Sequence, residues 1–126
     1  MARIIVDTSV IIDFIRYKDK SKTIFHKLNQ NNDVYISIIT HSELYAGKSV
    51  WEKSKARIIL EKILSNLYIV GISENISILA GKISFEYNTS IVDAVIAATA
   101  ISNKFPLATL NLKDFEKING LSLYKV

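Results

Sequence analysis

Carboxylates are the residues of this sequence whose types and positions could support chemistry. The 126 residues include no cysteine and two histidines, so thiol nucleophiles, thiolate zinc sites and disulfide frameworks are excluded. Four acids are the candidates for such chemistry: Asp7, Glu43, Asp93 and Asp114. Oxygen ligands without histidine or cysteine suit Mg²⁺ or Mn²⁺ rather than zinc, and such sites typically act on phosphates. The residue types therefore predict a divalent-cation site for phosphate chemistry.

Two of these acids are surrounded by apolar sequence. Asp7 directly follows Ile4-Ile5-Val6, and Asp93 has no lysine or arginine within three residues on either side. An ionised carboxylate in such surroundings is costly unless it is paired or bound to a metal. If the carboxylates meet, two charges about 4 Å apart repel by roughly 4 kcal/mol at an effective dielectric constant of about 20. We therefore expect a cation to compensate them.

Helix capping is a competing interpretation for each acid taken alone. A carboxylate in the first turn of a helix interacts favourably with the helix dipole and with unpaired backbone amides. Asp7 is a candidate N-cap, and three pairs have the spacing of a capping box: Thr40 with Glu43, Ser90 with Asp93, and Asn111 with Asp114. Capping explains the position of the acids, but it does not explain the apolar setting of Asp7 and Asp93.

The pattern of apolar residues predicts alternating strands and helices. Short β-branched or apolar runs predict strands at 3–6, 34–37, 68–70, 106–109 and 121–124. Helical spacing and capping residues predict helices around 10–15, 22–29, 40–47, 50–64, 74–87, 91–102 and 111–118. We find no linker or repeat that would divide this alternation, so we expect one domain over residues 1–126.

This alternation predicts an α/β fold in three layers, with a central parallel sheet of about five strands and helices on both faces. In an open parallel sheet, ligands bind beyond the carboxyl ends of the strands. Asp7, Glu43 and Asp114 each follow a predicted strand. Asp93 begins a helix that runs antiparallel to the strand after it, which places its N-terminus at the same edge. All four acids are therefore expected to converge.

Composition places few limits on the partners of the protein. The formal net charge of +4 suits an anionic partner but is common in proteins that bind no nucleic acid. An acid at position 7 interrupts the apolar segment that a signal peptide requires, and no apolar run approaches the roughly 20 residues that span a bilayer. We expect a cytoplasmic protein that does not enter the membrane.

The acids and their neighbours resemble the motifs of PIN-domain nucleases, and within that family those of the VapC toxins of type II (VapBC) toxin–antitoxin pairs. The resemblance spans the whole chain and is carried by four segments: Ile5-Val6-Asp7-Thr8-Ser9, 38–47 with Glu43, 93–100 with Asp93, and 107–115 with Asp114. It implies a PIN-like fold, and it implies that the four acids bind Mg²⁺ or Mn²⁺, with Asp7 and Asp93 as the principal ligands.

The same resemblance assigns supporting roles to Ser9, Thr109 and Asn111, the hydroxyl and amide positions beside the acids. For two of them a simpler role is equally open, because Thr8 or Ser9 could cap the first helix and Asn111 the last. A role as catalytic support and a role as a helix cap both remain for these residues.

The implied activity is metal-dependent endoribonuclease hydrolysis of RNA phosphodiesters, with 3′-hydroxyl and 5′-phosphate products. The implied partners are RNA, a VapB-like antitoxin, and either a second copy of the chain or a toxin–antitoxin hetero-oligomer. The amphipathic helices between Ser21 and Leu64 could supply such contacts, although packing within the chain is the default for apolar stripes. Two alternatives are a PIN-domain RNA-processing nuclease that is not a toxin, and a non-catalytic RNA-binding module.

Overall fold

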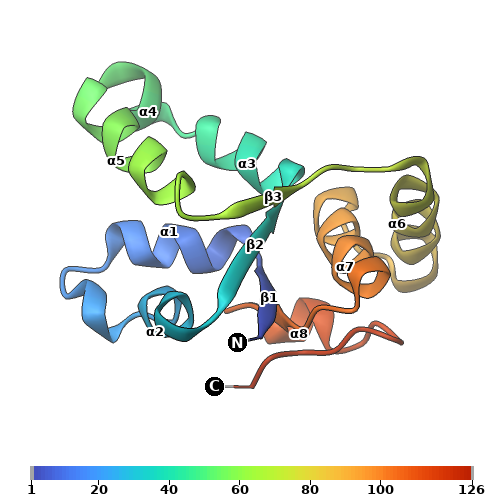
Figure 1. Ribbon diagram of the computed structural model, residues 1–126. Coiled ribbons are helices and arrows are strands. Elements are labelled where there is room, and N and C mark those ends of the chain that lie inside the picture. The colour runs from blue at the N-terminus through green and yellow to red at the C-terminus, as the bar shows by residue number, and fades with distance from the viewer. Residues whose placement is uncertain (1, 126) are drawn as a thin grey trace.

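Four parallel strands form the sheet of the computed structural model, which describes residues 2–125 (Figure 1). They are β1 (Arg3–Val6), β2 (Asp33–Ser37), β3 (Tyr68–Val70) and β4 (Leu107–Ala108), in the spatial order β3-β2-β1-β4. The apolar run of β1 is fully buried, as expected for a central strand of a parallel sheet that is covered on both faces. The sequence prediction of a parallel sheet is confirmed.

Helices cover both faces of this sheet and its carboxyl edge. They are α1 (Thr8–Arg16), the short 3-10 helix η1 (Lys20–Lys22), α2 (Ile24–Asn31), α3 (Ile38–Tyr45), α4 (Lys48–Glu52), α5 (Ser54–Leu64), α6 (Glu74–Tyr87), α7 (Ile91–Asn103) and α8 (Leu112–Phe115). In Figure 1, α1, α2 and α5 lie on one side of the sheet and α6 and α7 on the other. The predicted three-layer arrangement is therefore confirmed.

Each face of the sheet has its own apolar core. On one face Ile4 and Val6 of β1 pack with buried residues of α1, α2 and α5. On the other, Ile5 packs with Ala94 and Ala97 of α7 and with buried residues of α6. Consecutive side chains of a strand point to opposite faces, so one short strand contributes to both cores. β1 is thereby fixed in the centre of the molecule, and with it the residue that follows its end.

The predicted strand at 121–124 is reduced to a single β-bridge between Leu107 and Leu123. The amide of Leu107 donates to the carbonyl of Ser122 at 2.8 Å, and the amide of Tyr124 donates to the carbonyl of Leu107 at 2.8 Å. β4 is only two residues long, so it offers too short an edge for a longer ladder. The described sheet has four strands instead of about five.

Two helix boundaries also differ from the sequence prediction. The predicted helix at 50–64 is divided into α4 and α5, because Lys53 between them has an extended backbone with φ −128° and ψ 114°. The predicted helix at 40–47 starts earlier, at Ile38, and its N-cap is Ser37, whose hydroxyl accepts from the amide of Ile39 at 3.1 Å. The capping-box assignment of Thr40 and Glu43 was wrong, because Ser37 lies nearer the free amides of the first turn.

Within residues 2–125, no helix combines the length and the apolar content that crossing a bilayer requires.

Candidate active site

Asp7 lies at the point where β1 ends and α1 begins. Its side chain is buried, with 3% of its surface exposed. One carboxylate oxygen, Oδ1, accepts from the Ser9 hydroxyl at 2.6 Å and from the Val10 amide at 3.4 Å. The other, Oδ2, accepts from the Thr109 hydroxyl at 2.5 Å. Asp7 is therefore the N-cap of α1, as the sequence allowed, and it is also held by two hydroxyls.

Burial raises the pKa of Asp7 above its ordinary value, and the hydrogen bonds from Ser9 and Thr109 oppose this increase. A carboxylate oxygen has two lone pairs, and Oδ2 uses only one of them for Thr109. The second lone pair can meet a cation, and a cation would offset the cost of keeping this carboxylate ionised. The geometry around Asp7 thus fits a divalent ion.

Ser9 and Thr109 join the end of β1 to the loop before α8. The Ser9 hydroxyl accepts from the Leu110 amide at 3.2 Å, and the Thr109 hydroxyl accepts from the Asn111 amide at 2.9 Å. Ser9 does not cap the helix, since Asp7 does. Asn111 occupies the N-cap position of α8, but its side chain makes no capping hydrogen bond. Both hydroxyls connect Asp7 to the backbone that leads to Asp114.

Glu43 lies on α3 and is exposed to solvent. Its Oε1 accepts from the Thr8 hydroxyl at 2.5 Å, and that hydroxyl is also 3.2 Å from the hydroxyl of the fully buried Thr40. The sequence does not reveal this contact. Thr8 and Thr40 have the positions of candidate helix caps, and no local pattern pairs residues that are 35 positions apart in the chain.

Asp93 lies in the first turn of α7 and is partly buried. The chain reaches this turn after α6 ends at Tyr87, where the left-handed conformation of the C-cap residue Asn88 (φ 52°) reverses its direction. Ser90 then caps α7, accepting from the Asp93 amide at 3.2 Å. The predicted pairing of Ser90 with Asp93 is confirmed as a cap.

The pKa of Asp93 is raised, first by burial and then by the negative charges of Asp114, Asp7 and Glu43, while a hydrogen bond with Ser90 opposes the increase. Charges affect a pKa in this way only when they are close to the titrating group. The charges of Asp7 at the end of β1, Glu43 on α3 and Asp114 on α8 therefore act on Asp93. The convergence of the four acids on one metal site stays a prediction.

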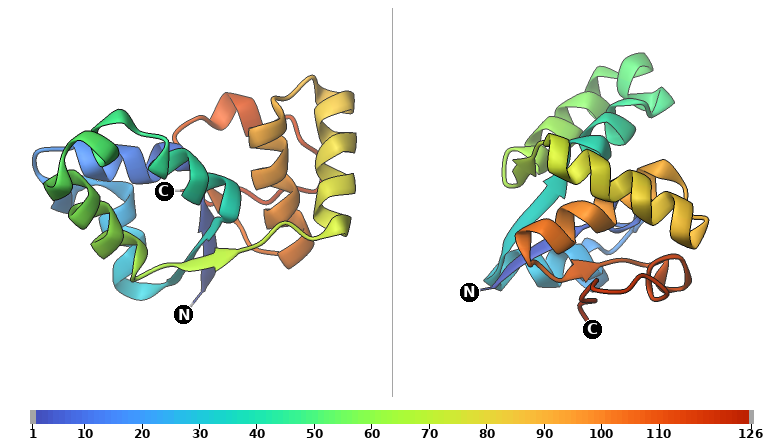
Figure 2. Two further views of the ribbon diagram at one scale, coloured as in Figure 1. Left: turned by 90° about the horizontal axis from the view of Figure 1, so that it is seen from above. Right: turned by 90° about the vertical axis from the view of Figure 1, so that its right-hand side faces the viewer.

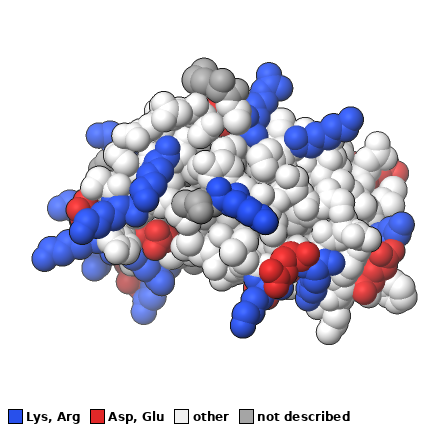
Figure 3. Space-filling model, turned by 90° about the horizontal axis from the view of Figure 1, so that it is seen from below, with Lys and Arg blue, Asp and Glu red and all other residues white. Residues whose placement is uncertain are grey.

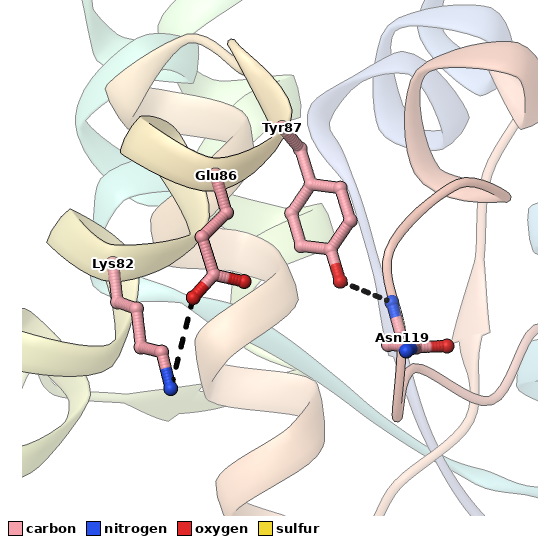
Figure 4. A network of polar contacts seen from close by, with 4 residues as sticks. All are labelled: Lys82, Glu86, Tyr87 and Asn119. Carbon is pink, nitrogen blue, oxygen red and sulfur yellow. Dashed lines mark hydrogen bonds and ion pairs between the residues drawn. The ribbon is translucent and has the colours of Figure 1, made fainter.

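Asp114 lies in the first turn of α8 and is exposed. Among residues 2–125, no side chain forms an ion pair with it. Its helix has four residues, and the loop beyond is tied to α6 because the Asn119 amide donates to the Tyr87 hydroxyl at 3.1 Å (Figure 4). The left view of Figure 2 shows α8 beside the N-terminal part of α7.

The acids are near one another but are not arranged as a finished coordination shell. In the part of the chain that the structure describes, no group of three or more Asp, Glu or His side chains is placed to hold one metal ion. The donor chemistry, with carboxylates and hydroxyls only, suits Mg²⁺ or Mn²⁺.

Basic side chains gather at one end of the molecule. Figure 3 shows the face below the view of Figure 1, where Lys and Arg outnumber Asp and Glu towards the end occupied by α1, η1 and α2. The exposed basic residues of that segment are Arg16, Lys18, Lys20, Lys22 and Lys27. Lys20 is engaged in part by the carbonyls of Phe14 and Ile15, at 2.7 and 2.9 Å, which end α1.

Comparison with known proteins identifies the family. The model of the PIN domain matches residues 4–121. Ribonuclease VapC1 of Rickettsia felis is 34% identical over 98% of this chain and 96% of its own length, and Ribonuclease VapC1 of Methanocaldococcus jannaschii is 32% identical over 98% and 88%. The crystal structure of DNA-bound VapBC from Salmonella typhimurium superimposes with a TM-score of 0.82, at 27% identity and 98% coverage of both chains. The chain belongs to the PIN domain family, and within it resembles the VapC ribonucleases of toxin–antitoxin systems.

Proposed function

We propose that this protein is a Mg²⁺- or Mn²⁺-dependent endoribonuclease, the toxin of a VapBC-type pair, and that residues 1–126 form one catalytic domain. The observation that carries the proposal is the geometry at the end of β1, where Ser9 and Thr109 hold both carboxylate oxygens of the buried Asp7. The raised pKa of Asp93, to which the charges of the three other acids contribute, supports a shared site, which capping of individual helices does not require. Relatives named ribonucleases over nearly the whole chain support RNA as the substrate.

In this proposal Asp7 and Asp93 are the principal metal ligands, and Glu43 and Asp114 complete the site. When bound, a divalent ion would polarise the scissile phosphate and stabilise the charge that develops on it. Asp7 enters the site already oriented, because hydroxyls of Ser9 and Thr109 hold both its oxygens. Glu43 and Asp114 are exposed and can orient an incoming water and the phosphate.

The test is RNA cleavage by the purified protein with Mg²⁺ or Mn²⁺. We expect cleavage to stop in EDTA, the products to carry 3′-hydroxyl and 5′-phosphate ends, and Asp93→Asn to be inactive. Asp33→Asn is the matched control, since Asp33 starts β2 at the opposite edge of the sheet. Cyclic phosphate ends would show that the 2′-hydroxyl is the nucleophile and would contradict the mechanism.

A groove beside the site supports the proposal of an antitoxin partner. It has a volume of about 460 Å³, and its walls come from α1, α3, α4 and α5. Its apolar lining includes Ile12, Ile15, Leu44, Val50 and Ile59, and Glu43 also borders it. We propose that an apolar segment of a VapB-like antitoxin binds there. The support is that similar structures are complexes of VapB with VapC, from Salmonella typhimurium and Rickettsia felis.

This partner can be tested by co-expression with the product of the neighbouring reading frame. We expect a stable complex without ribonuclease activity, and we expect Ile59→Asp, on the wall of the groove, to release an active toxin. Ile78→Asp is the control, because Ile78 is exposed on α6, outside the groove. A complex that survives Ile59→Asp unchanged would place the antitoxin elsewhere.

A non-catalytic RNA-binding module is the second candidate, favoured by the finding that the described acids are not arranged as a finished coordination shell. Calorimetric titration with Mn²⁺ separates the two candidates. A nuclease site should bind Mn²⁺ with an affinity that falls in Asp93→Asn, whereas a module without a site should show no binding that depends on the acids.

A further inference from the structure

The Thr8 hydroxyl lies between two residues of α3. It is 2.5 Å from Glu43 Oε1 and 3.2 Å from the hydroxyl of Thr40. Thr8 is the first residue of α1 and directly follows Asp7, whereas Glu43 and Thr40 are one helical turn apart on α3. A single side chain thus links the junction of β1 with α1 to the helix that carries Glu43.

The directions of these hydrogen bonds follow from the number of protons available. A threonine hydroxyl carries one proton, and an ionised carboxylate can only accept. The Thr8 hydroxyl therefore donates its proton to Glu43. In the hydrogen bond between the two hydroxyls, Thr40, which is fully buried, must then be the donor and Thr8 the acceptor. The result is a directed chain from Thr40 to Thr8 to Glu43, and hydrogen bonds to charged acceptors are the stronger kind.

Glu43 has little else to hold it in place. Its side chain is exposed, and among residues 2–125 it takes part in no ion pair. A free glutamate side chain samples several rotamers, and fixing it in one of them costs conformational entropy. The hydrogen bond from Thr8 restricts this freedom before any ligand arrives, and it does so from a residue adjacent to Asp7.

We infer that Thr8 is a positioning residue that sets the carboxylate of Glu43 relative to Asp7 for binding a divalent cation. The inference rests on the proposed metal site and adds to it a residue that does not itself touch the metal. Thr8 and Ser9 then have complementary tasks. Ser9 holds the Asp7 side, through Asp7 Oδ1 and the Leu110 amide, and Thr8 holds the Glu43 side.

The first test compares Mn²⁺ affinity by calorimetry in the parent, Thr8→Val and Thr8→Ser. Partners that orient a metal ligand typically contribute about 10- to 100-fold to metal affinity. We expect Thr8→Val to weaken Mn²⁺ binding about tenfold and Thr8→Ser, which keeps the hydroxyl, to restore it. Thr99→Val is the control, because it removes a buried hydroxyl that bonds only within α7. Parent-like affinity in Thr8→Val would overturn the inference.

A second variant separates positioning from stability. Thr8→Val leaves the buried hydroxyl of Thr40 without its partner, which by itself destabilises the fold. The double variant with Thr8→Val and Thr40→Val removes both hydroxyls and relieves that cost. We expect its melting temperature to recover towards that of the parent while Mn²⁺ affinity stays about tenfold weaker. Recovery of Mn²⁺ affinity along with stability would show that Thr8 acts only on the fold.

A double-mutant cycle identifies the residue through which Thr8 acts. In a Glu43→Gln background we expect Thr8→Val to change Mn²⁺ affinity less than twofold, because its target has already lost its charge. An unchanged tenfold effect in that background would contradict the inference. If the parent itself bound no Mn²⁺, the proposed function would fail instead, so the two failures are distinguishable.

Discussion

The two ends of the acidic site differ in how firmly they are held. Asp7 is buried, caps α1, and receives hydroxyl hydrogen bonds at both of its oxygens. Asp114 is exposed on a helix of four residues, and no side chain that the structure describes forms an ion pair with it. The first acid has a fixed position in the core, and the second can move with its short helix.

This difference indicates which carboxylate of the proposed site has its orientation determined by the fold. A buried carboxylate with satisfied oxygens keeps its orientation in the free protein, so it can define the place of a ligand. An exposed carboxylate can adjust when the ligand binds. We therefore expect a site with a rigid side at Asp7 and an adaptable side at Asp114, with Asp93 subject to the charge of both.

The largest expected effect comes from removing each end in turn. Asp7→Asn should lower the rate of RNA cleavage by more than about 100-fold, beyond the range typical of supporting partners, whereas Asp114→Asn should lower it by about tenfold. The measurement is kcat/KM on one RNA with Mg²⁺ held constant. Equal losses in the two variants would break the distinction between a rigid and an adaptable side.

The support of the rigid side can be tested at Thr109. Thr109→Val removes the hydrogen bond to Asp7 Oδ2 with little change of shape, and we expect Mn²⁺ affinity to fall about tenfold. Asn111→Ala is the comparison, because that side chain makes no capping bond. A greater loss in Asn111→Ala than in Thr109→Val would mean that the amide, not the hydroxyl, supports the site.

Asp7 and Asp93 should contribute more to the stability of the metal-free protein in acid than at neutral pH. Both pKa values are raised in the fold, so these groups contribute stability below the unfolded value of about 3.9 and lose it as pH rises through the folded values. In EDTA, we expect their contribution to the melting temperature to shrink as pH rises from about 4 to neutral, and Asp93→Asn to flatten this dependence.

Divalent cations should reverse that loss at neutral pH. Mn²⁺ at 100 times its Kd adds about 2.7 kcal/mol to the free energy of unfolding, which for a chain of this size raises the melting temperature by about 10 °C. Asp93→Asn should show a much smaller increase. If the melting temperature changed neither with pH nor with Mn²⁺, the acids would not form one site.

The smallest expected change in stability concerns the hydroxyl of Thr89, which, unlike that of Thr109, does not contact Asp7. Thr89 is buried, and its hydroxyl has no hydrogen-bond partner in the described residues. Thr89→Val should therefore stabilise the protein by about 1 kcal/mol, or about 4 °C, without changing Mn²⁺ affinity. Thermal unfolding checks this, and a destabilised Thr89→Val would indicate that the hydroxyl has a partner after all.

The sequence predicted most of the fold because its signals are local. The β-branched run before Asp7 and the uniformly apolar segment of α7 each require burial, and both are found where expected. The prediction of a strand at 121–124 was wrong, because the length of that strand depends on β4, its partner in space. A pattern of residues does not reveal how much edge a distant neighbour will offer.

The sequence was enough to propose the site as a set of acids, but not to predict their contacts. The proposal followed from the position of each acid relative to its strand. The hydrogen bonds from Thr8 to Glu43 and from Thr109 to Asp7 join residues 35 and 102 positions apart, so no local spacing indicates them. The hydroxyl of Ser37, which lies nearer the free amides, also displaced that of Thr40 as the cap of α3.

The contact between Asp7 and Thr109 has a consequence for synthesis of the chain. It spans 102 residues, and it depends on pairing of β1 with β4, which cannot occur until residue 108 has been made and has left the ribosome. Asp114 arrives later still. A growing chain that lacks residues 107–114 therefore contains three of the four acids but cannot yet hold Asp7 through Thr109.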